Sequence, residues 1–219
     1  MKKLTFVSLC IGLIGLLAAP LASAAILDFS TGTAGGGGTI VDLGGGDAQG
    51  IDIFIDHLFV SGTSADGGYD VDGALACASG AGGSCAALSF DTAAGTFSIV
   101  GSVPGLGVGA TTLLSGTIDS FSFTNAGGIA AFFGTGTDTK DAGLLASVGI
   151  PPNTPFDFTG FTLGFSPIPC GEGQTCYTAF STDFVNSSGV GGEAVPEPGT
   201  LVLLGGGLLG LLRGRKRND

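Results

Sequence analysis

Apolar and polar residues alternate along much of this chain with the two-residue period of a β-strand. Between residues 51 and 60, one expected face carries three isoleucines, His57 and Phe59, whereas Asp52 and Asp56 occupy the other. Further alternating runs contain Phe97 and Ile99, then Phe161, Leu163 and Phe165, then Phe180 and Phe184. Turns rich in Gly, Asp and Ser separate the runs. The pattern predicts an all-β body, built as an antiparallel β-sandwich of the jelly-roll or immunoglobulin-like kind.

Glycine makes up 43 of the 219 residues, well above its usual share of about 7%. Such a composition can indicate disorder, but disordered segments are also poor in apolar residues, and this chain has 16 phenylalanines. We therefore expect a folded domain with many tight turns. Residues 31–39 and 43–50 contain glycine runs and are predicted to be loops. Residues 127–133 and 141–148 fit either short helices or edge strands.

The longest apolar run, residues 111–124, changes phase along its length. Leu114 and Ile118 have even numbers, whereas Phe121 and Phe123 have odd numbers. A single regular strand cannot place both halves on the same face, because its side chains alternate strictly. A β-bulge or bend near residues 119–121 would bring the two halves onto one face.

Four cysteines lie in the body as two local pairs, Cys77 with Cys85 and Cys170 with Cys176. An even number of cysteines in an exported domain favours disulfides. Of the three possible pairings, the two short loops are favoured because both enclose glycines that let the chain fold back. A zinc site is the alternative, but neither spacing is C-x-x-C and the single histidine is distant in sequence.

Charge is distributed very unevenly. Sixteen of the 18 acidic residues and only one of the seven cationic residues, Lys140, lie between residues 25 and 195, which gives this body a formal charge of −15. Binding to a phosphate backbone needs clustered cations. Nucleic acid is therefore excluded as a partner, and an anionic membrane surface is disfavoured.

The N-terminal segment has the organisation of a secretory signal peptide. Lys2 and Lys3 precede an apolar stretch over residues 4–19, and Ala22 and Ala24 form an A-x-A cleavage site. We expect residues 1–24 to be recognised by a Sec-type export machinery and removed by signal peptidase. The body would then comprise residues 25–185, followed by a flexible linker at residues 186–195.

The C-terminal segment combines three features in a fixed order: a Pro-Glu-Pro triplet, an apolar stretch and a cluster of cations. These are Pro196, Glu197 and Pro198, then residues 201–212, then Arg213, Arg215, Lys216 and Arg217. The cations favour retention of that end in the cytoplasm, so the body is expected on the other side of the inner membrane. A helix over residues 199–212 would span about 21 Å of a hydrocarbon core about 30 Å thick. It would therefore be a short, temporary transmembrane anchor.

These features, with the signal peptide at the other end, resemble the PEP-CTERM sorting signal of Gram-negative bacteria. The resemblance covers residues 196–219. It implies that a membrane protease of the transpeptidase-like kind, exosortase, recognises and cuts the tail of a protein sent to the cell surface or to an exopolysaccharide matrix. The implied route runs through an inner-membrane-anchored precursor with a periplasmic body.

Two groups of residues invite a chemical role. His57 is the only imidazole, but its position in an apolar strand face favours a half-buried structural histidine over a general base. Asp66, Asp70 and Asp72 lie among glycines and offer the oxygen ligands that calcium prefers, although the spacing is not that of an EF-hand. A solvated acidic turn is the alternative to this calcium site.

The function expected from the sequence is a non-enzymatic structural or adhesive role at the cell surface or in the extracellular matrix. A carbohydrate- or calcium-dependent binding module is the first alternative, and a secreted hydrolase is the second. No cofactor other than the possible calcium ion is expected. Expected partners are the export machinery, signal peptidase, exosortase and exopolysaccharide, with the inner membrane contacted through the tail.

Overall fold

The computed structural model describes residues 25–32, 34, 37–126, 129–171 and 174–189. All of them belong to one compact unit, Ala24–Gly191. The strands are β1 (Ala25–Ser30), β2 (Gly37–Gly44), β3 (Asp47–Ile55), β4 (His57–Ser61), β5 (Gly67–Asp70), β6 (Leu75–Ala76), β7 (Ser84–Asp91), β8 (Thr96–Val103), β9 (Val108–Ala126), β10 (Ile129–Lys140), β11 (Phe156–Ile168) and β12 (Thr175–Gly189). A 3₁₀ turn, η1 (Pro104–Leu106), and one short helix, α2 (Ala142–Ser147), complete the described elements.

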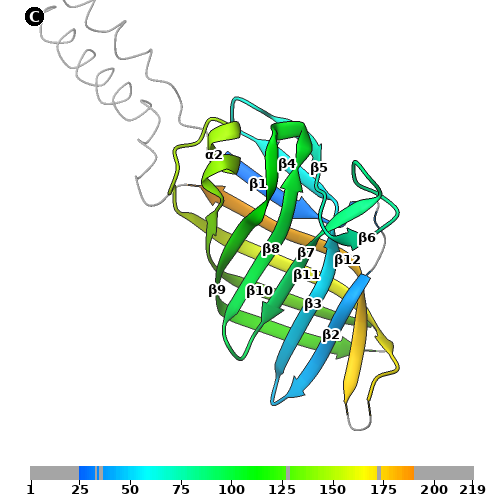
Figure 1. The fold of residues 1–219 in the computed structure, drawn as a ribbon. Helices are drawn as coiled ribbons and strands as arrows, with labels where there is room; N and C mark the ends of the chain where they lie inside the picture. Colours follow the sequence, from blue (N-terminus) through cyan, green and yellow to red (C-terminus); the bar gives the residue numbers. More distant parts are fainter. Residues whose placement is uncertain (1–24, 33, 35–36, 127–128, 172–173, 190–219) are drawn as a thin grey trace, which may run out of the picture. The chain divides into compact units, whose positions relative to one another are not determined.

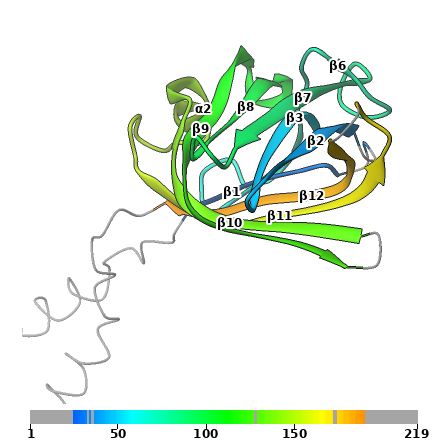
Figure 2. The ribbon, with the colours of Figure 1, turned by 90° about the horizontal axis from the view of Figure 1, so that it is seen from below.

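The strands form a continuous antiparallel sheet in the order β11-β10-β9-β8-β7-β3-β2-β12-β1-β4-β5, with β6 added beside β7. A further pairing of β11 with β12 joins distant parts of this path. Figure 2 shows β1, β10, β11 and β12 in one layer facing β2, β3, β7 and β8, while the long strands β9 and β10 curve between them. Figure 1 shows the strands of the two layers crossing at a steep angle. The all-β, antiparallel expectation is confirmed, whereas the jelly-roll or immunoglobulin-like type stays a prediction.

The core lies between the layers and is filled by apolar side chains from both. Phe29, Phe156 and Phe165 are the largest side chains that are completely buried. Helix α2 adds Leu144 and Leu145 to the same core. Its N-cap, Asp141, accepts a hydrogen bond from the backbone N–H of Leu144 at 2.9 Å, which stabilises the first turn. Residues 141–148 are therefore largely helical, and residues 129–133 belong to strand β10.

The predicted single strand over residues 51–60 is wrong, because the chain breaks at Asp56 between β3 and β4. The backbone N–H of Asp56 donates a hydrogen bond to Ser30 O, and the backbone carbonyl of Asp56 accepts one from Val71 N. Asp56 therefore does not continue the pairing of β3 with β2 and β7. After the break, Leu58 and Val60 are buried and Phe59 is 48% exposed. Apolar residues occur at both even and odd positions of residues 57–60, so alternation alone does not identify the buried face. The prediction placed Phe59 on the buried face, whereas Leu58 and Val60 occupy it.

Both predicted glycine-rich loops are shorter than expected. Residues 37–39 belong to β2 and residues 47–50 belong to β3, so only residues 45–46 form the turn between these strands. Glycine is required inside the strands for packing: a Cβ on Gly37 would overlap the Phe54 ring, and a Cβ on Gly50 would overlap the Phe90 ring. The glycines give aromatic rings room in the sheet and do not mark a loop.

The predicted bulge in the long run is confirmed. Thr135 of β10 pairs with Ser120 of β9, while the next residue, Gly136, pairs with Ile118, so Asp119 is the extra residue. The predicted linker, in contrast, begins too early. Residues 187–189 continue β12 and pair with the first residues of β1, with Gly189 opposite Ala25.

Among the described residues, no helix is both long enough and apolar enough to span a membrane. The expected signal helix and the expected transmembrane helix fall in residues 1–24 and 196–219, outside the described residues. The absence of a membrane-spanning helix is therefore a statement about the described residues of the body alone.

Replacing Gly50 by Ala is expected to lower the free energy of unfolding by about 1–3 kcal/mol, because the new methyl group overlaps the buried Phe90 ring. Urea denaturation followed by circular dichroism measures the change. Gly109→Ala is the matched control, since a Cβ at this β9 glycine meets no atom within 4 Å, and a change within about 0.5 kcal/mol is expected. Equal effects of the two substitutions would contradict this account of glycine use.

Candidate functional site

A shallow trough lies across β3, β7 and β8 on the surface of the sheet. Its floor is the backbone of Gly50, Phe90 and Phe97, which stand opposite one another on the three strands. The two phenylalanine side chains are 3% and 4% exposed and belong to the core. Because side chains alternate along a strand, the residues on either side of this buried row point outward.

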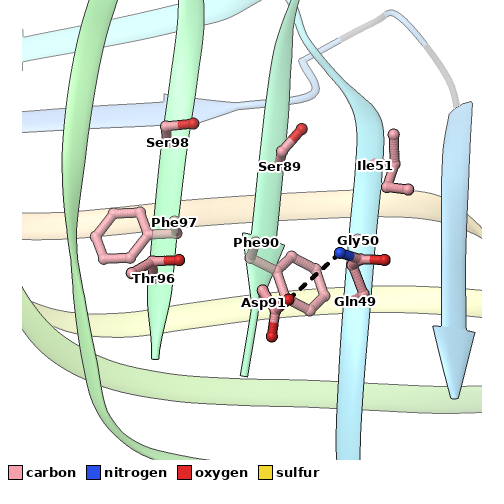
Figure 3. Close-up of a pocket in the computed structure, with 9 residues that line it drawn as sticks. All are labelled: Gln49, Gly50, Ile51, Ser89, Phe90, Asp91, Thr96, Phe97 and Ser98. Carbon is pink, nitrogen blue, oxygen red and sulfur yellow. Dashed lines mark hydrogen bonds between the residues drawn. The ribbon is translucent and has the colours of Figure 1, made fainter. Parts of the chain in front are cut away.

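Two polar flanks border the floor. One contains Gln49, Asp91 and Thr96, and the other contains Ile51, Ser89 and Ser98. Together with the floor they enclose a hollow of about 320 Å³. Figure 3 shows these side chains arranged along three neighbouring strands, with the strands of the other layer behind them.

The Gln49 and Asp91 side chains form a polar pair at one end of the trough. Gln49 Nε2 donates a hydrogen bond to Asp91 Oδ2 at 3.3 Å, as the dashed line in Figure 3 marks. Asp91 Oδ1 accepts from the backbone N–H of Ala94 at 2.9 Å, which fixes the orientation of the carboxylate. An amide and a carboxylate held together in this way offer both donors and acceptors to a ligand.

Ile51 reaches the surface because of a β-bulge. The β3–β7 register shifts between Gly50 and Ile53, and Asp52 adopts a left-handed backbone with a φ of 56°. The bulge turns the Ile51 side chain outward, where it is 43% exposed. The trough therefore has one apolar side chain on an otherwise polar rim.

A buried ion pair lies on strand β10, which is separated from the trough strand β8 by β9. Lys140 Nζ is 2.6 Å from Asp138 Oδ1, and neither side chain is exposed to solvent. The ammonium also lies 3.9 Å from the centroid of the Phe156 ring, a cation–π contact. Asp138 Oδ2 accepts no hydrogen bond from the part of the chain that the structure describes. Lys140 is the only cation among the described residues.

Burial controls the protonation of both partners. Desolvation lowers the pKa of Lys140 to about 8, partly opposed by the neighbouring Asp138 carboxylate. Desolvation also raises the pKa of Asp138, opposed by the charge of Lys140 and by its hydrogen bond. Each charge is thus held in an apolar site mainly by the other.

The shift at Lys140 predicts a pH dependence of stability. Between about pH 8 and its ordinary pKa of 10.5, the unfolded chain binds the Lys140 proton more tightly than the folded chain does, so the free energy of unfolding rises with pH. Relative to an Asp138→Leu/Lys140→Met double variant, the wild type should gain about 2 kcal/mol between about pH 7 and about pH 9.5. At acidic pH the raised pKa of Asp138 has the opposite effect. The folded chain binds the Asp138 proton more tightly than the unfolded chain does, so the free energy of unfolding falls as the pH rises.

Chemical denaturation of both proteins across this pH range measures the difference. The single variant Lys140→Met provides a control, because it leaves a buried carboxylate without its cation and should cost about 3–5 kcal/mol near neutral pH. A constant difference between wild type and double variant from neutral to alkaline pH would show that Lys140 titrates normally.

The residues predicted to bind calcium, Asp66, Asp70 and Asp72, do not form a metal-holding group of side chains in the described part of the chain, and the calcium site stays a prediction. Asp66 Oδ1 accepts from the backbone N–H and the hydroxyl of Thr63, and the backbone bond is the main cause that lowers its pKa. Asp72 Oδ1 accepts from Ala81 N at 2.7 Å. Across the described residues, no three His, Cys, Asp or Glu side chains form a group that could hold a metal ion.

His57 lies at the start of β4, opposite Asp70 of β5 and Ser30 of β1. Its side chain is half-buried, and a Cβ on Gly68 would come within 2.9 Å of its ring. The structure therefore places His57 in the packing of the sheet, as expected, and away from the trough.

The cysteines form disulfides between Cys77 and Cys85 and between Cys170 and Cys176. The Cα atoms are 5.8 Å apart in the first pair and 5.9 Å apart in the second. The first bond ties the loop before β7 to that strand, and the second closes the loop that leads into β12. These are the two short loops that the glycine content favoured.

The remaining site residues lie outside the described residues. They are Ala22 and Ala24 of the signal peptide, Pro196, Glu197 and Pro198 of the sorting triplet, and Arg213, Arg215, Lys216 and Arg217 of the basic end. A comparison with known protein families tests the prediction of a sorting signal at the C-terminal end. The sequence model of the PEP-CTERM protein-sorting motif matches residues 194–217.

The chain carries a PEP-CTERM sorting motif. This motif implies exosortase-dependent export to the cell surface, with exosortase as the processing partner. Proteins with the motif are exported and are anchored in the membrane through the C-terminus before processing. No curated protein and no solved structure is a significant match to the chain.

Sequence reasoning missed both the trough and the ion pair. The polar side chains of the trough come from three strands, and only their register brings them together. A signal was present in short repeats of hydroxyl-bearing residues two positions apart, such as Thr96 and Ser98, or Thr137 and Thr139. For the ion pair, the signal was the isolation of Lys140, the one cation of the body, two residues after Asp138.

Proposed function

We propose that this protein is a non-enzymatic structural or adhesive component of the cell surface or extracellular matrix. The sorting motif at residues 194–217 is the observation that carries the proposal, because it specifies export and processing. The body has features that suit an exterior environment. It contains two disulfides, a continuous antiparallel sheet and a strongly negative charge.

The path of the chain supports delivery of the body as a folded unit. Ala25, the first residue after the expected signal-peptidase site, pairs with Gly189 near the end of β12. Only four residues separate Gly189 from the matched motif, which begins at residue 194. Both the expected signal-peptidase site and the matched motif lie, in sequence, outside the described strands, so removal of either segment would leave every described strand in place.

The surroundings of His57 support a role without catalysis. A general base must face the group from which it takes a proton. His57 instead packs over Gly68 within the β4–β5 pairing, and no residue of the trough lies opposite it in the sheet. A secreted hydrolase remains the less favoured alternative, and it would have to rely on carboxylates alone.

Replacing Pro196, Glu197 and Pro198 together by Ala is expected to abolish processing and to cause the uncut precursor to accumulate in the inner membrane. The reason is that the substitution removes the rigid, acidic triplet on which recognition of the tail would depend. Cell fractionation and immunoblotting of a chain tagged within the body and at the C-terminus would measure the loss of the C-terminal tag.

A neighbouring triple variant, Gly191→Ala/Gly192→Ala/Glu193→Ala, is the matched control and should be processed normally. Normal processing of the triplet variant would refute recognition at residues 196–198. A wild-type product that keeps both ends in the cytoplasm would refute the proposed destination as well.

A further inference from the structure

The two flanks of the trough continue across two more strands. On one side, Thr96 pairs with Thr117 of β9, and Thr117 pairs with Thr137 of β10. On the other side, Ser98 pairs with Ser115, and Ser115 pairs with Thr139. We name the first row, from Gln49 and Asp91 to Thr137, the threonine flank, and the second, from Ser89 to Thr139, the serine flank.

The residues between the flanks continue the floor. Phe97 pairs with Gly116 of β9, and Gly116 pairs with Asp138 of β10. Asp138 is buried in its ion pair with Lys140, whereas Thr137 and Thr139 on either side of it are exposed. The buried pair thus fixes strand β10 with its two hydroxyl side chains facing outward.

The dimensions of this surface follow from sheet geometry. At a spacing of about 4.8 Å between strands, the threonine flank crosses five strands and is about 19 Å long, whereas the serine flank crosses four strands and is about 14 Å long. Flanks two residues apart are separated by about 6.8 Å. The surface is therefore long and narrow, and it runs across the strands. Such a shape fits an extended linear polymer better than a compact ligand.

The chemistry of the flanks is that of hydroxyl groups. Each Ser or Thr offers one donor and two acceptor positions, as a sugar hydroxyl does. The hydroxyls of Thr117 and Thr137 are 3.0 Å apart and so point to the same side of the sheet. At the far end, the Gln49–Asp91 pair adds an amide donor and a carboxylate acceptor, and Ile51 offers an apolar contact to a sugar ring.

The charge of the body restricts the ligand further. The flanks contain one ionisable residue, Asp91, and the only cation among the described residues is the buried Lys140. An anionic polymer would meet no positive charge and would be repelled by a body of formal charge −15. The same charge opposes the packing of a second copy against this surface.

We infer that the two flanks bind a neutral, linear polysaccharide laid across strands β3, β7, β8, β9 and β10. This inference rests on the proposed function, because it names the partner class through which the body would adhere. Hydroxyls of the threonine and serine flanks bond the sugar hydroxyls, and the Gln49–Asp91 pair and Ile51 hold one sugar ring at the end of the trough.

Affinity electrophoresis tests the inference on the full-length chain in mild detergent, in native gels that contain hydroxyethyl cellulose, dextran, mannan or the anionic polymer alginate. The test variant, Thr96→Val/Thr117→Val/Thr137→Val, removes three hydroxyls and keeps the shape and strand propensity of the side chains. The matched control, Thr112→Val/Ser122→Ala, removes two exposed hydroxyls of β9 that lie off the flanks.

At least one neutral polymer should retard the wild type and the control, and the test variant should bind it about tenfold or more weakly because several hydrogen bonds are lost. Circular dichroism should show unchanged folding of all three proteins. The inference is overturned if no neutral polymer retards the wild type, if alginate retards it more strongly, or if the test variant binds like the control. Self-association that the triple substitution abolishes would also overturn it.

Failure here is distinguishable from failure of the proposed function. If the protein reaches the surface and loses its C-terminal tag, but binds no neutral polysaccharide, the proposed route stands and only the ligand is refuted. If the protein stays in the cytoplasm yet binds a neutral polysaccharide through the flanks, the binding surface stands and the route is refuted.

Discussion

The pairing of β12 is the constraint on which the rest of the sheet depends. Its first part, residues 175–179, pairs with β2, and its later part, residues 183–189, pairs with β1. Its other edge pairs with β11 along most of its length. One strand therefore connects the branch β1-β4-β5 with both ends of the longer path from β2 to β11.

The body obtains its stability with almost no help from ionic contacts. One ion pair is found among the described residues, and it lies inside the core, where desolvation offsets much of the attraction between its charges. Apolar burial around Phe29, Phe156 and Phe165 must therefore supply most of the favourable free energy. The surface is left to hydroxyls and carboxylates. Because cations are so few, the surface can present a face with a single carboxylate, Asp91, such as the two flanks, on a strongly negative molecule.

The sequence was sufficient to predict the class of fold and one local irregularity. Alternation predicted the strands, and the change of phase before Phe121 predicted the bulge that the register places at Asp119. The sequence did not identify the buried face of residues 57–60, where apolar residues occur at both even and odd positions. It also did not identify Gly50 as a strand residue, because this glycine makes room for the Phe90 ring and does not mark a loop. The candidate site escaped prediction for a related reason, since its residues become neighbours only through the register of three strands. The sorting motif was accessible because it is contiguous in sequence.

The pairing of Ala25 with Gly189 also has a consequence for the time course of export. The first strand of the body, β1, has one of its two partners, β12, at the opposite end of the body. Contacts between residues so far apart in sequence form slowly, because the intervening chain must close a long loop. The sheet therefore cannot be completed before β12 is free to pair with β1. In an export that starts at the N-terminus, the body would stay incomplete until its last strand has crossed the membrane.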